Sequence, residues 1–174
     1  MAHVPWHVPA ATGRDVSVPP HQGYNTKMYP VILTIHSFLR WMVILLGIWA
    51  VVSVLPSRLA AVSRAAALPG LLFSMVLDIQ LLAGLLLYVV LSPITVVAMQ
   101  DMTGTMKNGG WRYWTVEHPA LMILAVASAH IGRPRGAGAA PGKHAVIWYG
   151  LALLAILLAT PWPFMPQGRP WVRW

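Results

Sequence analysis

The sequence contains no cysteine and very few charged residues. The missing cysteine excludes disulfide bonds, thiolate metal sites, iron–sulfur clusters and covalently attached c-type haem. Only 9% of the residues are charged and 57% are apolar, whereas a soluble domain carries about 25% charged residues. Because so few charges cannot cover a water-exposed surface, the composition predicts an integral membrane protein.

Acidic residues are scarcer than basic residues. Four Asp and Glu stand against twelve Lys and Arg, which gives a formal net charge of +8. The basic residues are scattered singly and most flank apolar runs, where they act as topology signals. We therefore expect a lipid bilayer, and not nucleic acid, as the partner. No nucleophile–base pair, phosphate-binding loop or metal motif favours a stand-alone enzyme.

Long apolar runs lie between clusters of proline and glycine. Each run approaches the roughly 20 residues that a helix needs to cross a bilayer, and in lipid the backbone must satisfy its own hydrogen bonds. The sequence therefore predicts an all-α fold, a four-transmembrane-helix up-down bundle over residues 29–164. An extended N-terminal tail over 1–28 precedes it, and a short Trp-rich tail over 165–174 follows. The predicted helices cover about residues 29–55, 71–91, 114–131 and 145–160.

The basic residues of two loops predict the orientation. The loops between the first and second and between the third and fourth predicted helices carry basic residues without acids: Arg58, Arg64, Arg133, Arg135 and Lys143. The positive-inside rule makes these loops cytoplasmic. Both termini, and a surface-lying connection over residues 94–110, then face the exterior. We expect a multi-pass protein of a bacterial inner membrane, with both termini in the periplasm.

Two histidines lie at nearly one depth in the predicted bundle. At 1.5 Å per residue, His36 falls about 9 Å and His118 about 7–8 Å to the exterior side of the midplane. The first and third helices of an up-down bundle are diagonal partners, so these side chains could ligate one haem iron from opposite sides. A lone membrane histidine more often makes a hydrogen bond, and it is the matched depth that favours a shared haem b.

Other ionisable residues in the predicted spans need partners. Arg40 lies one turn below His36 near the midplane, where a bare guanidinium is costly. We expect an ion pair with Asp78, the alternative being that Arg40 binds a haem propionate or a quinone carbonyl. Glu117 could orient a neighbouring histidine or receive a proton from outside, and as a plain interfacial carboxylate it suits a helix N-terminus. We interpret His130 as structural, because no second histidine is placed to share a haem with it.

Several short patterns resemble a family of small four-helix bacterial membrane proteins that are labelled cytochrome b-like. They are His-Ser-Phe-Leu-Arg-Trp at 36–41, Gln-Leu-Leu-Ala-Gly at 80–84 followed by Tyr88, Glu-His-Pro at 117–119, Tyr149-Gly150, and Pro-Trp-Pro at 161–163. The similarity covers about residues 29–164 and implies the four-helix fold and, less directly, a haem. Helix two of that family often carries histidine where this chain has Asp78, so the resemblance implies no ligand on helix two.

The function hypotheses fall into three classes. The first is a b-type cytochrome-like electron-transfer subunit that binds one haem near the exterior face through His36 and His118, with Arg40 and Glu117 beside it. The second is a non-catalytic accessory subunit of a larger respiratory or photosynthetic complex, whose tails contact neighbouring subunits and whose histidine could ligate a (bacterio)chlorophyll. The third is a quinone site formed by His36, Arg40 and Glu117.

Overall fold

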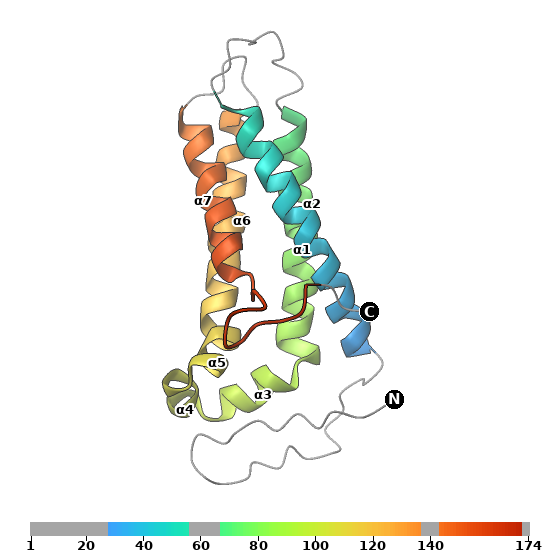
Figure 1. Ribbon diagram of the computed structural model, residues 1–174, viewed down its shortest axis with the longest axis vertical. Helices are drawn as coiled ribbons and strands as arrows, with labels where there is room; N and C mark the ends of the chain where they lie inside the picture. Colours follow the sequence, from blue (N-terminus) through green and yellow to red (C-terminus); the bar gives the residue numbers. More distant parts are fainter. Residues whose placement is uncertain (1–27, 56–66, 137–142, 172–174) are drawn as a thin grey trace.

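The computed structural model describes residues 28–55, 67–136 and 143–171, and within these ranges the chain is helical without any strand. The long helices pack as a bundle (Figure 1). α1 packs on α2, α2 on α6, α6 on α7 and α7 on α1, so α1 and α6 lie on a diagonal. The all-α prediction is confirmed for the described residues. The long helices are α1 (Met28–Ser53), α2 (Ala67–Leu86), α6 (His118–Gly136) and α7 (Lys143–Ala159).

Two helical segments are long and apolar enough to cross a membrane. One is α1, and the other is Ala67–Leu91, in which α2 continues into the π-helical turn η1 (Leu87–Leu91). A shorter apolar helix runs over His144–Ala159. The described residues therefore contain two candidate spans, where the sequence predicts four. The predicted N-terminal tail lies outside the described residues, apart from Met28, with which α1 begins.

The connection between α2 and α6 is helical. It lies across one end of the bundle (Figure 1) and covers the segment for which the sequence predicts a surface-lying connection. Asp101 and Asn108 cap two of its helices, because their side-chain oxygens accept hydrogen bonds from the backbone N–H groups of Gly104 (2.9 Å) and Trp111 (3.1 Å). The elements are α3 (Pro93–Gln100), α4 (Met102–Lys107), α5 (Gly109–Arg112) and the π-helical turn η2 (Tyr113–Glu117), which leads into α6.

The opposite end of the bundle is held by a tyrosine in a glycine socket. Tyr149 of α7 is only 1% exposed and is the largest of the fully buried side chains. A Cβ atom on Gly132 would lie 2.9 Å from its Cδ1, one on Gly136 would lie 3.1 Å from its Cε2, and one on Gly70 would overlap its hydroxyl. Because these residues have no side chain, the ring can contact α2 and α6 together.

Residues 160–171, here called the C-terminal segment, turn back from α7 towards α1 (Figure 1). The carbonyl of Trp171 accepts hydrogen bonds from Arg40 Nη2 (2.9 Å) and from Trp41 Nε1 (3.0 Å). The ring of Trp171 also stacks on that of Trp41, with centroids 5.8 Å apart. The described part of the predicted Trp-rich tail is therefore packed against the bundle.

The socket generates a stability prediction. Gly132→Ala should lower the free energy of unfolding in detergent, since the added methyl overpacks a buried ring at a cost of about 1–3 kcal/mol. This exceeds the gain of up to about 1 kcal/mol that alanine brings to a helix. Gly150→Ala is the matched control, because a Cβ atom there meets nothing within 4 Å, and it should leave stability unchanged or slightly raised. Equal stability of the two variants in thermal unfolding would contradict the socket.

Candidate functional site

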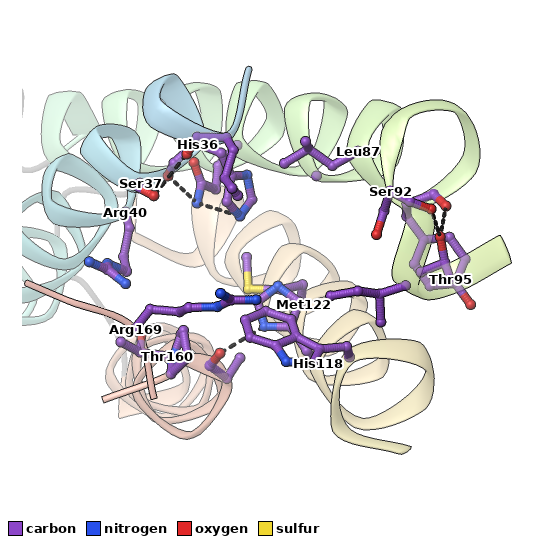
Figure 2. A pocket seen from close by; sticks show the side chains of 18 of the residues that line it. His36, Ser37, Arg40, Leu87, Ser92, Thr95, His118, Met122, Thr160 and Arg169 are labelled. Carbon is purple, nitrogen blue, oxygen red and sulfur yellow. Dashed lines mark hydrogen bonds between the residues drawn. The ribbon is translucent and has the colours of Figure 1, made fainter. Parts of the chain in front are cut away.

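A cavity of about 120 Å³ lies between the long helices (Figure 2). Most of its lining is apolar, with a few polar side chains that come from every side of the bundle. Because these residues are far apart in the sequence, the cavity exists only in the assembled fold. Its polar and charged lining includes His36, Ser37 and Arg40 from α1, Gln80 from α2, His118 from α6, and Thr160 and Arg169 from the C-terminal segment.

The two histidines that the sequence singles out meet across the diagonal. Their ring centroids are 6.3 Å apart, and the ring planes make an angle of 65°. The predicted approach of His36 and His118 is therefore confirmed. Both imidazoles line the cavity, one from α1 and the other from the first residue of α6 (Figure 2).

Proline residues after α7 set the orientation of His118. In a continuing helix the N–H of residue 163 would donate to the carbonyl of Ala159, but Pro163 has no N–H. Instead, His118 Nδ1 donates to that carbonyl at 2.7 Å, and the hydroxyl of Tyr113 donates to it at 2.7 Å. Since a carbonyl only accepts, the proton of His118 is on Nδ1, and in the neutral ring Nε2 keeps its lone pair.

The carbonyl of Leu157 also lacks its helical donor because of a proline. Its helical donor would be the N–H of residue 161, which is also proline. The indole Nε1 of Trp162 replaces it at 2.9 Å. The prolines of Pro161-Trp162-Pro163 therefore end α7 and leave the carbonyls of Leu157 and Ala159 to accept hydrogen bonds from side chains.

Gln80 holds the other histidine. Its side-chain Nε2 donates to the carbonyl of His36 at 3.1 Å and lies 3.3 Å from Nε2 of the imidazole. Gly84, one turn further along α2, gives the ring its space, because a Cβ atom there would lie 3.1 Å from His36 Cε1. Two buried atoms, His36 Nδ1 and Gln80 Oε1, have no hydrogen-bond partner among the described residues. Hydrogen-bonding capacity is thus left over on this side of the cavity.

Two π-helical turns adjoin the cavity. η1 contains Tyr88, whose hydroxyl donates to the carbonyl of Thr115 in η2 at 2.8 Å. η2 ends at Glu117, immediately before His118. Such turns are rare and are frequent at functional sites. Here the hydrogen bond between them determines the position of the connection between α2 and α6 at its entry into α6.

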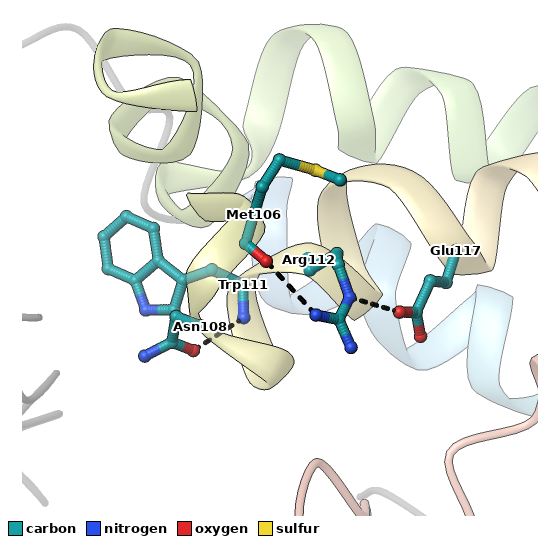
Figure 3. A network of polar contacts seen from close by, with 5 residues as sticks. All are labelled: Met106, Asn108, Trp111, Arg112 and Glu117. Carbon is teal, nitrogen blue, oxygen red and sulfur yellow. Dashed lines mark hydrogen bonds and ion pairs between the residues drawn. The ribbon is translucent and has the colours of Figure 1, made fainter. Parts of the chain in front are cut away.

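Glu117 does not join the cavity that the sequence assigns to it. Its carboxylate pairs with Arg112 Nε at 2.6 Å, and Arg112 Nη1 also donates to the carbonyl of Met106 at 3.1 Å (Figure 3). Side chains five residues apart do not share a face of an α-helix, where neighbours are three or four apart. The wider π-helical turn between them aligns the two. Glu117 is absent from the lining of the cavity.

The predicted ion pair between Arg40 and Asp78 is wrong. Asp78 accepts instead from His130 Nε2, with 2.9 Å to Oδ1 and 3.2 Å to Oδ2. Arg40 lines the cavity and donates to the Trp171 carbonyl. Depth along the helix predicts which residues share a level, but the direction of a side chain around the helix axis decides its partner, and Asp78 is directed to α6.

Arg169 is a cavity residue that sequence reasoning missed. Its guanidinium lies 5.0 Å from the ring centroid of Trp114 and reaches into the site from the C-terminal segment (Figure 2). The prolines at 161, 163 and 166 predict that the chain turns after α7, but they do not predict where it returns. Together with Arg40, Arg169 gives the cavity two cationic side chains.

Comparison of the chain with protein-family models, with curated proteins and with solved structures finds no match. The resemblance to the cytochrome b-like family remains a prediction.

The shared carbonyl generates a test. Tyr113→Phe removes one donor to Ala159 and should lower the free energy of unfolding in detergent by about 1 kcal/mol, the net value of such a hydrogen bond. Tyr29→Phe is the matched control, since the Tyr29 hydroxyl makes no hydrogen bond within the described ranges, and its stability should not change. A Tyr113→Phe protein as stable as the control would show that His118 alone satisfies the carbonyl.

Proposed function

We propose that the chain is a multi-pass membrane protein that binds one haem b between His36 and His118 and serves as a b-type cytochrome-like electron-transfer subunit. The spacing of the imidazoles carries this proposal. Metal–nitrogen bonds of about 2 Å, extended by half a ring on each side, put the centroids of two axial histidines roughly 6 Å apart. The centroids of His36 and His118 are 6.3 Å apart.

The number of ligands favours haem over a bare metal ion. Structural and catalytic zinc sites need three or four protein ligands. The described residues contain no group of three or more histidines and carboxylates that could hold a metal ion. A haem iron needs only two axial ligands, because the macrocycle supplies the rest. A pair of facing histidines is therefore a donor set that suits a haem iron and is too small for a bare metal ion.

The surroundings of each histidine fit axial ligation. A ligating histidine usually donates its other N–H to a carbonyl or carboxylate, as His118 does to Ala159. On the other side, a metal bond at His36 Nε2 requires Gln80 to keep only its bond to the His36 carbonyl. Arg40 and Arg169 would hold the propionates through charge-assisted hydrogen bonds.

The cavity must open for a macrocycle. Its volume of about 120 Å³ is below the roughly 300–1,000 Å³ of ligand sites. Met122 is a lining side chain that can move, since methionine has three rotatable bonds. When bound, haem supplies one-electron redox chemistry. The residues of this chain bind it, orient the imidazoles and exclude water.

The outer faces of all the long helices support a membrane location with four spans. Leu45 on α1, Leu82 on α2, Ile123 on α6 and Leu154 on α7 are each more than half exposed. Large apolar side chains exposed around the whole circumference suit lipid and not water. Trp111 of α5 and Trp114 of η2 belong to the connection that lies across one end of the bundle (Figure 1), as expected of an interfacial belt.

A quinone head group is the second candidate for the cavity. The buried atoms His36 Nδ1 and Gln80 Oε1 lack partners among the described residues, and a quinone or quinol oxygen could hydrogen-bond to them. An apolar cavity of about 150 Å³ binds a single benzene ring, so the present volume suits one ring better than a macrocycle.

The spectrum of the purified protein separates these candidates. We expect a reduced-minus-oxidised haem b spectrum that His36→Ala and His118→Ala abolish or strongly perturb. His130→Ala is the control, because His130 pairs with Asp78 and lies outside the cavity lining, and it should leave the spectrum unchanged. A wild-type protein without haem absorption that co-purifies with quinone would favour the second candidate.

The topology is tested separately. Arg133 and Arg135 are exposed at the end of α6, and the positive-inside rule places that end in the cytoplasm. A phosphatase fused after Trp174 should be active, because both termini face the exterior. The same reporter inserted after Gly136 should be inactive. The reverse pattern would overturn the orientation without affecting the haem proposal.

A further inference from the structure

An ion pair stands on the outside of the bundle, between α2 and α6. His130 Nε2 lies 2.9 Å from Asp78 Oδ1, and the two side chains are 45% and 43% exposed. Neither residue lines the cavity. Asp78 is near the middle of Ala67–Leu91, a segment long and apolar enough to cross a membrane. The pair therefore falls at the depth where an ionisable group is most costly.

Its exposure is unusual for that depth. Ionisable side chains inside a membrane almost always face the bundle interior or a water-filled cavity. The outward side chains one turn away on α2 are apolar: Met75 and Leu82, three residues before and four after Asp78, are 50% and 65% exposed. Lipid chains cannot form hydrogen bonds to this half-exposed polar pair. A polar or protein contact is therefore needed to shield it from the lipid.

The face on α6 is shaped for close helix contact. Residues 120, 123, 127, 130 and 134 are all exposed and follow one another at helical spacings of three and four. Ala120 and Ala127 are small, and small residues in such a stripe let the backbones of membrane helices approach each other. His130 lies one turn after Ala127, so a helix packed there would also reach the ion pair.

We propose that this α2/α6 face is an interface between two copies of the chain. A two-fold contact sets the same face against itself, so it must be self-complementary. The face presents an acceptor, the Asp78 carboxylate. It also presents a donor when the imidazole of the ion pair is protonated, because both ring nitrogens then donate and Nδ1 makes no hydrogen bond to the part of the chain that the structure describes. Each imidazole can then bridge the carboxylates of both copies. The inference rests on the proposed membrane location and is independent of haem.

Cross-linking tests this interface directly, because the chain has no cysteine of its own. Ala127→Cys, oxidised in native membranes with copper phenanthroline, should form a disulfide-linked species of twice the monomer mass that thiol reductant reverses. Leu45→Cys is the control on the outer face of α1, where the side chain is 66% exposed, and it should stay monomeric. Asp78→Asn in the Ala127→Cys background should lower the cross-linked fraction severalfold.

Each other outcome contradicts the proposal. A monomeric Ala127→Cys protein, or equal cross-linking of Leu45→Cys, would remove the interface. A product whose mass is not twice the monomer would identify a different partner on this face. Alkaline carbonate extraction of the same membranes reports membrane integration, and the haem spectrum of the same variants reports the cavity, so failure of the interface is distinguishable from failure of the proposed function.

Discussion

A backbone carbonyl at the end of α7 holds the candidate site together. Pro163 cannot donate to Ala159, so Tyr113 and His118 both do. Tyr113 begins η2 and His118 begins α6, and one acceptor therefore fixes both ends of the turn through which the chain enters the bundle. The same proline-rich sequence turns the chain back over the helices, which brings Arg169 to the cavity.

The two imidazoles are held unequally. His118 has its proton placed by a carbonyl that nothing else in the α7 backbone can satisfy. His36 depends on Gln80, an amide with an unpartnered oxygen, and has an unpartnered nitrogen of its own among the described residues. A buried polar atom without a partner costs about 1–3 kcal/mol. The α1 side of the cavity can therefore gain free energy by rearranging its hydrogen bonds, whereas His118 on the α6 side is already fixed by its bond to Ala159.

The sequence predicts the depth of a residue along its helix better than the direction of its side chain around the helix axis. Hydrophobic runs and rise per residue place His36 and His118 at one level, and the tendency of ionisable side chains in a membrane to face the bundle interior turns them towards each other. Asp78 shows the limit, since the sequence predicts Arg40 as its partner but the carboxylate is directed to His130. The prediction that Glu117 lies beside the histidines is wrong for a further reason. The π-helical turn η2 changes the direction of its side chain, and no compositional signal in the sequence marks that turn. The position of Arg169 in the cavity depends on the path of the C-terminal segment, and the local sequence does not predict that path.

The two ends of the bundle are packed differently: one contains the closely packed Tyr149 socket, and the other contains the cavity. Around Tyr149, glycines on α2 and α6 let three helices approach each other closely. Towards the far end, bulkier side chains such as Trp114 and Met122 line the cavity. The glycine socket thus fixes the relative placement of α2, α6 and α7, while the end that contains the cavity keeps the side-chain freedom of Met122.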